Sequence, residues 1–265
     1  MTRIVGRRVL RYGQVGSTMD LAAEFAAAGE PEGLVVVADE QTAGRGRAGR
    51  AWQAPPGSAL LMTVLLRPDV PADRLSVLAP LAGVALAEAI ETATGLPCWL
   101  KWPNDLWLGE RNAGKKAAGV LSSARMLGGK PDHVLVGIGL NVSTPPSVLP
   151  DGATSIAVEI EAAGAGQAVA HADRERILAA LLSRLDAHYA AFVLNREQPD
   201  LDGWLARAAM LGEPVMVEVG GAMHRGIHAG IDNDGALLLR LDDGSLERIV
   251  AGDLTRGPRR RDAQG

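Results

Sequence analysis

A glycine- and arginine-rich stretch between two short apolar runs limits how the first part of this chain can fold. Residues 42–52 read Thr-Ala-Gly-Arg-Gly-Arg-Ala-Gly-Arg-Ala-Trp, and glycines at this density disfavour both helix and strand. The flanking runs, residues 34–38 and 59–66, have the length and the apolar character of buried strands. The sequence therefore predicts a mobile cationic loop between two core strands, with arginines and backbone amides that suit an anionic ligand.

The overall charge limits the partners of this loop. The chain carries a formal net charge of −4, and no wider basic field surrounds the three arginines. This balance disfavours a nucleic-acid-binding surface, which needs an extended basic patch. A solvated surface loop is the alternative interpretation, because charged runs usually face water.

Composition indicates the class of protein and its cellular compartment. Hydrophobic residues make up 47% of the chain and charged residues 22%, as in ordinary globular proteins. The single cysteine, Cys98, excludes an intrachain disulfide and indicates a reducing, cytoplasmic setting. The spacing of the histidines does not match that of metal ligands. The first eleven residues lack the apolar core of a signal peptide. The apolar segment over residues 75–90 is too short to span a bilayer. We expect neither a structural metal nor a membrane span.

The pattern of segments predicts an α+β protein with two domains. Helical and strand-like segments mix over residues 1–211, whereas short strands separated by Gly, Asn and Asp turns follow in residues 212–265. This alternation of short strands and turns indicates a small β-barrel or sandwich. It is followed by a polar, basic tail from Arg256, which we expect to fray. The expected helices cover residues 19–28, 71–94 and 171–194. The expected strands cover residues 7–15, 34–38, 59–66, 116–121, 134–142, 214–219, 222–231, 236–241 and 246–250, with two further strand pieces in residues 100–108 around a Pro-Asn-Asp turn.

Two polar positions have both a structural and a binding interpretation. Ser17 or Thr18 can cap the helix over residues 19–28, or can present hydroxyls to a pocket. Residues 109–115 match Gly-x-x-x-x-Gly-Lys, but Lys116 stands where a phosphate loop requires Ser or Thr, so we reject that motif. Lys116 begins an apolar run, either as a strand-edge surface residue or as a fixed positive charge for phosphate or carboxylate oxygens.

Glycines inside a predicted core strand mark a possible ligand contact. Gly137 and Gly139 interrupt the apolar residues of the strand over residues 134–142, and the polar Asn141 is its next-to-last residue. Glycine weakens a strand interior unless another group approaches the backbone closely. We expect a ligand to lie against this strand.

Five motifs follow one another over roughly residues 10–145. They are Gly16-Ser17-Thr18, Gln41-Thr42-x-Gly44-Arg45-Gly46-Arg47-x-Gly49-Arg50-x-Trp52, Lys101-Trp102-Pro103-Asn104-Asp105, Lys116-x-x-Gly119-x-Leu121 and Gly137-x-Gly139-x-Asn141. In this order they resemble the motifs of bacterial biotin–protein ligases. Two positions depart from the family pattern: Met19 stands where Asn is usual, and Ser122-Ser123 where an acidic residue is common. The strand before Ser17 starts close to Met1, so we expect no helix-turn-helix domain and no operator binding.

The resemblance implies a mixed-sheet catalytic domain packed with helices, a C-terminal SH3-like barrel and a two-step reaction. Biotin and ATP, with Mg²⁺, would give biotinyl-5′-AMP and pyrophosphate. A lysine of the biotin carboxyl carrier protein domain of an acyl-CoA carboxylase would then take the biotinyl group as an amide. The closest alternative is a lipoate or octanoate ligase or transferase of the same fold. A biotin sensor without catalysis is a further alternative, in which Lys116 would be dispensable.

The same resemblance assigns residues to each ligand. Lys116 and Arg47 would be catalytic, and Asp105 would contact the Mg²⁺ that ATP carries. Biotin would contact Ser17, Thr18, Gln41, Gly44, Arg45, Gly46, Arg47, Lys116 and Gly119. ATP and the adenylate would contact Arg45, Arg47, Arg50, Trp52, Asn104, Lys116 and Asn141.

Overall fold

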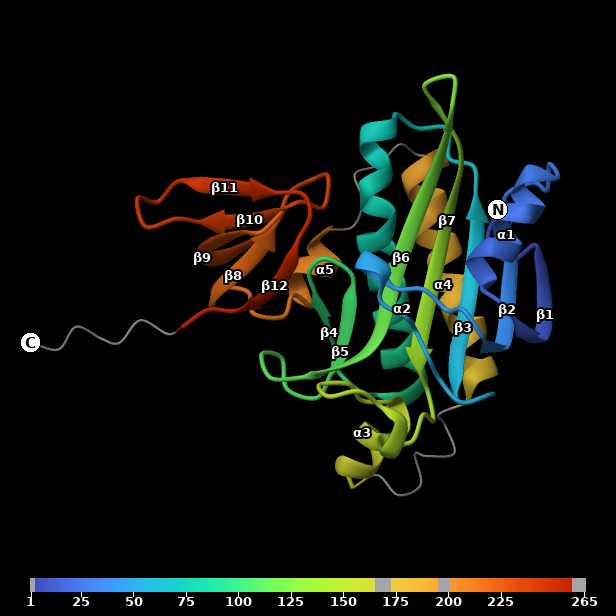
Figure 1. Cartoon of the computed structure of the whole chain (residues 1–265), viewed down its shortest axis with the longest axis horizontal. Helices are drawn as coiled ribbons and strands as arrows, with labels where there is room; N and C mark the ends of the chain where they lie inside the picture. The colour runs from blue at the N-terminus through green and yellow to red at the C-terminus, as the bar shows by residue number, and fades with distance from the viewer. Residues whose placement is uncertain (1–2, 165–172, 195–200, 259–265) are drawn as a thin grey trace, which may run out of the picture.

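A seven-stranded mixed sheet forms the larger part of the molecule (Figure 1). The computed structural model describes residues 3–164, 173–194 and 201–258. The strand order is β1-β2-β3-β7-β6-β5-β4, in which only β1 and β2 pair in parallel. The strands are β1 (Arg8–Val15), β2 (Leu34–Gln41), β3 (Ala59–Leu66), β4 (Cys98–Lys101), β5 (Asp105–Leu108), β6 (Lys115–Leu127) and β7 (Lys130–Asn141).

Helices cover the two faces of this sheet unequally. On β2, Leu34 and Val36 pack against α1 (Thr18–Ala27), whereas the alternate residues Val35 and Val37 join the main core with α2 and α4. This alternation follows from the two-residue period of a strand. Figure 1 shows the long helices α2 (Leu78–Thr94) and α4 (Arg174–Leu194) side by side behind the sheet. Since α1 has only ten residues, part of its face of the sheet stays uncovered by helix.

The segment Ala72–Thr94 is the apolar helix of the core. It begins as a 3-10 helix, η2 (Ala72–Val77), continues as α2, and ends at Gly95 in the left-handed conformation. Pro80 lies in the first turn of α2, where its missing amide hydrogen costs no bond. The sequence predicts an apolar segment over residues 75–90 that is too short to span a bilayer, but the helical segment has 23 residues and is long and apolar enough to cross a membrane. Of its most apolar window, 72% is buried inside the protein. Its hydrophobicity is therefore explained by packing in the core.

A five-stranded antiparallel sheet forms the C-terminal part. Its order is β11-β10-β9-β8-β12, and the two end strands do not pair with each other among the described residues, so the strands make an open sheet. It docks on the larger part through Trp102, whose Nε1 donates to Gly235 O at 3.0 Å. The strands are β8 (Pro214–Val219), β9 (Ala222–Ile231), β10 (Leu237–Arg240), β11 (Leu246–Ile249) and β12 (Asp253–Arg256).

Several elements differ from the sequence prediction. The strand β12 was missed because its four residues, Asp-Leu-Thr-Arg, have no apolar run. Arg256, which we expected to begin a frayed tail, instead pairs with Val215 of β8. The helix expected over residues 171–194 begins at Arg174, and residues 171–172 lie outside the described residues. The sequence prediction also lacked the short elements η1 (Arg47–Gly49), η3 (Pro146–Val148), α3 (Ile156–Ala162) and α5 (Leu201–Ala206).

A fully buried histidine lies beneath the C-terminal sheet. The ring of His228, in β9, meets that of Trp204 edge to face, with centroids 6.2 Å apart. Neither ring nitrogen has a hydrogen-bond partner among the described residues. Burial lowers the pKa of His228 to about 4, so the ring is neutral in the folded protein near neutral pH.

We expect acid to destabilise the protein through His228. The unfolded chain takes up this proton near pH 6.5 and the folded chain only near pH 4, so stability is lost as pH falls between these values. The free energy of unfolding should fall by about 2 kcal/mol between about pH 7.5 and about pH 5 through this group. Denaturant unfolding of the wild type and of His228→Leu measures it: the variant should lack that part of the loss, and equal losses would contradict the assignment.

Candidate functional site

The part of the sheet that α1 leaves uncovered forms a cavity of about 430 Å³. Its floor is built by β6 and β7, where Gly119 lies opposite Gly139 and Leu121 opposite Gly137. Ser17 and Thr18 at the start of α1 close one side, and residues 45–53 close another. Most residues that the sequence singled out are thus brought together: Ser17, Thr18, Gln41, Arg45, Gly46, Arg47, Arg50, Trp52, Asn104, Lys116, Gly119 and Asn141 all line this cavity.

Side chains of the protein, not open space, lie against the two glycines of β7. A Cβ on Gly137 would lie 3.0 Å from Met19 Sδ, and one on Gly139 would lie 2.6 Å from Cε2 of Trp52. The close approach predicted for this strand is therefore present, but its partners are Met19 and Trp52. Both also line the cavity, so a ligand would lie beside them.

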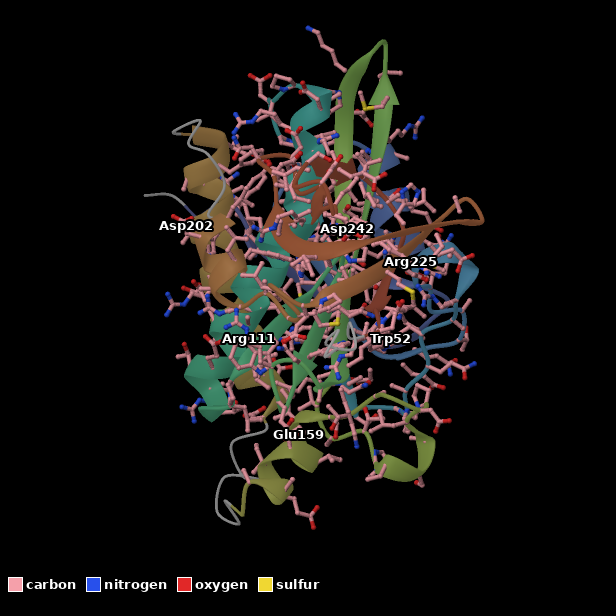
Figure 2. The ribbon with its side chains drawn as sticks, turned by 90° about the vertical axis from the view of Figure 1, so that its left-hand side faces the viewer. Trp52, Arg111, Glu159, Asp202, Arg225 and Asp242 are labelled. Carbon is pink, nitrogen blue, oxygen red and sulfur yellow. The ribbon has the colours of Figure 1, made fainter. Side chains whose placement is uncertain are left out.

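Trp52 joins the loop to the floor of the cavity. Its indole packs over Gly139 and Gly119 of neighbouring strands, and its Nε1 is buried with no hydrogen-bond partner among the described residues. Lys116 Nζ lies 5.8 Å from the ring centroid, within the range of a cation–π contact. Figure 2, viewed from the side of the C-terminal sheet, labels Trp52. The indole therefore fixes the end of the loop to the floor of the cavity.

A hydroxyl and amide network forms the end of the cavity next to α1. Ser17 is the N-cap of the helix, and its Oγ accepts a bond from Met19 N at 3.3 Å. Gln41 Oε1 accepts from both the backbone N and the Oγ1 of Thr18, at 2.7 and 2.9 Å. Thr63 Oγ1 donates to Thr18 Oγ1 at 2.8 Å. Capping and pocket lining are thus combined at one helix start, and fixed polar groups face an otherwise apolar recess.

The Gly/Arg segment is a small hairpin in this structure, in contrast to the predicted mobile loop. Arg45 and Ala51 form an antiparallel bridge, and Gly46 N donates to Arg50 O at 2.7 Å. The tip is the 3-10 turn η1, where Ala48 has a φ of 53°. These backbone hydrogen bonds hold the three arginines together on one short hairpin. The composition alone could not reveal them.

The cavity wall is strongly cationic. Among the described residues it contains four basic side chains, Arg45, Arg47, Arg50 and Lys116, and no Asp, Glu or His. Since the whole chain has a net charge of −4, this concentration of positive charge is local. Such a wall favours anions and stabilises charge that builds up on oxygen atoms.

Each cation of the wall is paired with a carboxylate that does not line the cavity. Arg45 pairs with Asp20 of α1, and Lys116 Nζ lies 2.6 Å from Asp105 Oδ1. The carboxylate of Asp253, in the C-terminal sheet, pairs with Arg50 at 3.2 Å and lies 3.8 Å from Arg47. From outside the cavity lining, these carboxylates restrict the orientations of the basic side chains.

Two predicted ligand contacts do not reach the cavity. Asp105, predicted to contact Mg²⁺, lies outside the lining and is engaged by Lys116. Gly44, predicted to contact biotin, lies at the base of the hairpin, where a side chain would collide with the carbonyl of Trp52 and approach Gln41 Nε2 at 3.0 Å. Gly44 permits close packing of the hairpin, and Asp105 holds a lysine.

The two asparagines fix the walls through backbone contacts. Asn104 Nδ2 donates to Val120 O at 2.8 Å, and its Oδ1 accepts from Arg47 Nη1 at 3.3 Å. Asn141 Nδ2 donates to Thr154 O at 3.0 Å, which ties β7 to the segment after η3. Leu149, Pro150 and Ala153 of that segment also line the cavity. No sequence motif marks them, because long-range contacts bring this loop to the site: the parallel bridge between Lys116 and Ala153 and the Asn141 contact with Thr154.

Comparison with known proteins gives a consistent result for both parts of the chain. Residues 13–141 match the family described as "Biotin/lipoate A/B protein ligase family", and residues 210–254 match "Biotin protein ligase C terminal domain". The chain is 38% identical over 210 residues to the biotin--[acetyl-CoA-carboxylase] ligase of Paracoccus denitrificans, covering 77% of this chain and 83% of the relative. It is 32% identical over 256 residues to the bifunctional ligase/repressor BirA of Bacillus subtilis, covering 97% and 76%.

A solved structure extends the likeness to the whole fold. The biotin protein ligase from Aquifex aeolicus in complex with biotin and ATP superposes with a TM-score of 0.76 at 28% sequence identity. The match covers 95% of this chain and 100% of the other. Both sheets therefore correspond to the arrangement in that protein.

Proposed function

Because this chain belongs to the biotin protein ligase family, we propose that its cationic cavity activates biotin with ATP and passes the biotinyl group to a carrier-protein lysine. The observation that carries this proposal is the wall of four basic side chains without a carboxylate. Two anions, the biotin carboxylate and the ATP triphosphate, must approach each other there. Cationic donors that reduce their repulsion are what such a step requires.

The first half-reaction joins the two anions. A carboxylate oxygen of biotin attacks the α-phosphorus of ATP, the bond to the bridging β-oxygen breaks, and pyrophosphate leaves. The described wall offers no Asp, Glu or His as acid or base, and the attack itself transfers no proton. Catalysis therefore rests on positioning and on stabilisation of charge at the α-phosphoryl oxygens.

The second half-reaction releases AMP. The neutral amine of a lysine attacks the acyl carbon of biotinyl-5′-AMP, and the bond from that carbon to the phosphate oxygen breaks. The nitrogen loses a proton to solvent as the amide forms and AMP leaves. The acceptor that we propose is the biotin carboxyl carrier domain of an acyl-CoA carboxylase. The name of the Paracoccus relative gives acetyl-CoA-carboxylase as the target of that protein.

Each end of the cavity suits a different substrate. The hydroxyl and amide groups of Ser17, Thr18 and Gln41 beside an apolar wall suit the ureido ring of biotin. Lys116, which lines the cavity from β6, would bind the carboxylate and then the acyl-phosphate oxygens. The other proposed contacts are Arg45, Gly46, Arg47 and Gly119 for biotin, and Arg45, Arg47, Arg50, Trp52, Asn104 and Asn141 for the nucleotide.

Mg²⁺ would enter with ATP in this proposal. No group of three or more His, Cys, Asp or Glu side chains able to hold a metal exists among the described residues, and Asp105 is occupied by Lys116. The protein therefore fits a metal carried on phosphate oxygens and not a resident ion, a form of binding that Mg²⁺ commonly takes.

We also propose that the two domains meet near residue 211, as residues 1–211 and 212–265. The helix α5 ends at Ala206 and β8 begins at Pro214. The C-terminal family match begins at residue 210. Both observations support a boundary in the short connection.

Carboxylic-acid-dependent exchange of pyrophosphate into ATP tests the proposed function. Purified protein is assayed with biotin, lipoate and octanoate in parallel, without a carrier protein. We expect exchange with biotin alone, because Gln41 and the hydroxyls beside it need polar partners that a lipoyl or octanoyl chain lacks. Exchange with lipoate or octanoate instead would favour the alternative ligase, and no exchange with any acid would favour a biotin sensor.

A further inference from the structure

Two arginines of the hairpin reach across to the C-terminal sheet. Arg50 Nη2 lies 3.2 Å from Asp253 Oδ1, and Arg47 Nη1 lies 3.8 Å from the same oxygen. Both terminal nitrogens of Arg47 also lie 3.4 Å from the carbonyl oxygen of Gly252. The residues that hold these arginines thus belong to the start of β12, far along the chain.

The backbone at Gly252 fixes the direction of this contact. Its φ of 150° is one that L side chains rarely adopt, and an added Cβ would lie 2.6 Å from Val217 Cγ1 and 2.7 Å from Glu218 O. Asp253 pairs with Glu218 in the ladder between β12 and β8. A tight contact with β8 therefore sets where the Gly252 carbonyl and the Asp253 carboxylate face.

Within its own domain, Arg47 has a single side-chain partner among the described residues, Asn104 Oδ1 at 3.3 Å. Its side chain is 25% exposed, whereas those of Arg50 and Asp253 are 60% and 53% exposed. Ion pairs this exposed add little to the stability of a fold. Their effect is to restrict the rotamers of two long side chains that would otherwise move freely.

We propose that Asp253, together with the Gly252 carbonyl, is a positioning residue that holds Arg47 and Arg50 ready for the phosphates of ATP. A guanidinium carries five N–H donors, so one carboxylate leaves several free for phosphate oxygens. A side chain ordered before the ligand arrives loses less entropy on binding. The C-terminal domain thereby completes the nucleotide half of a site built otherwise by the first domain. This inference rests on the proposed function.

Steady-state pyrophosphate exchange with Asp253→Asn tests the inference. Asparagine keeps the shape of the side chain but removes the charge that attracts both guanidinium groups. The KM for ATP should rise by roughly three- to tenfold, while the KM for biotin and the melting temperature stay near the wild-type values. A purely structural role would lower the melting temperature and affect both substrates alike.

Three further variants make the result specific. Asp234→Asn is the matched control, because Asp234 pairs with Arg248 in the same domain at 2.8 Å and is 51% exposed; it should change neither KM. Asp253→Glu restores the charge and should recover most of the affinity for ATP. In an Arg50→Ala, Arg47→Ala background, Asp253→Asn should have no further effect, since its partners are gone.

Several outcomes would overturn the inference, and they differ from a failure of the proposed function. An unchanged KM for ATP in Asp253→Asn, an equal rise for biotin, or an undiminished effect without the two arginines would each show that Asp253 does not act through them. Absence of biotin-dependent exchange in the wild type would instead remove the proposed function itself.

Discussion

Lys116→Ala should slow biotin-dependent pyrophosphate exchange by roughly 10- to 150-fold, equivalent to about 1.5–3 kcal/mol. Lys116 is the cation of the wall that lies on a strand of the sheet, as the second residue of β6, and Asp105 fixes its ammonium group at 2.6 Å. In the proposed reaction it faces oxygens whose charge changes as the acyl phosphate forms. Its loss removes a charge-assisted hydrogen bond that no neighbouring group can replace, because the other three basic residues sit on the hairpin.

The adjacent lysine provides the control for this experiment. Lys115→Ala removes the same charge one residue earlier in β6, but Lys115 is exposed and does not line the cavity. Exchange by that variant should stay close to the wild-type rate, and the melting temperature of both variants should change little. Wild-type exchange by Lys116→Ala would exclude the catalytic role of Lys116.

Asp105→Asn is expected to have a smaller effect than Lys116→Ala, since its carboxylate acts through the lysine. The sequence motif Lys-Trp-Pro-Asn-Asp suggested a metal contact at Asp105, because carboxylates next to a turn are common Mg²⁺ ligands. The motif could not show that β5 and β6 pair with Trp107 opposite Lys116. That register brings the Lys116 ammonium group to the Asp105 carboxylate. Strand register is a property of the whole fold, so a short motif cannot show it.

The sequence located most of the site because its residues carry strong local chemistry. Arginines among glycines, hydroxyls before an Ala-rich helix and glycines inside an apolar strand each depart from what local structure alone would need. Leu149 and Pro150 have no such signature, since apolar residues in a Pro-rich loop resemble any surface connection. They reach the cavity through long-range bridging of their loop to β6.

The behaviour of the Gly/Arg segment was the least predictable feature. Its composition indicated a mobile loop, and that inference is sound for an isolated chain. In the folded protein, Asp20 holds Arg45, Asp253 holds Arg50, and the indole of Trp52 rests on the sheet. These partners lie in three separate elements, so only the tertiary structure brings them to the loop.

Gly139→Ala should weaken the binding of biotin and ATP by at least about tenfold, or about 1.4 kcal/mol. The new Cβ would lie 2.6 Å from Cε2 and 2.9 Å from Cδ2 of Trp52. β7 lies between β3 and β6 in the middle of the sheet and cannot move aside, so the indole must leave and draw the hairpin away from the cavity. The backbone at Gly139 is not left-handed, so alanine itself causes no strain there.

The neighbouring glycine separates this steric effect from a general one. Gly137→Ala places a Cβ 3.0 Å from Met19 Sδ, the end of a flexible side chain that can rotate away at little cost. Calorimetric titration with biotin should therefore show a much smaller loss for Gly137→Ala than for Gly139→Ala, with similar melting temperatures for both. If both variants bound as the wild type does, contact between Trp52 and the strand would not hold the hairpin. If both lost affinity equally, the cause would lie in the strand and not in Trp52.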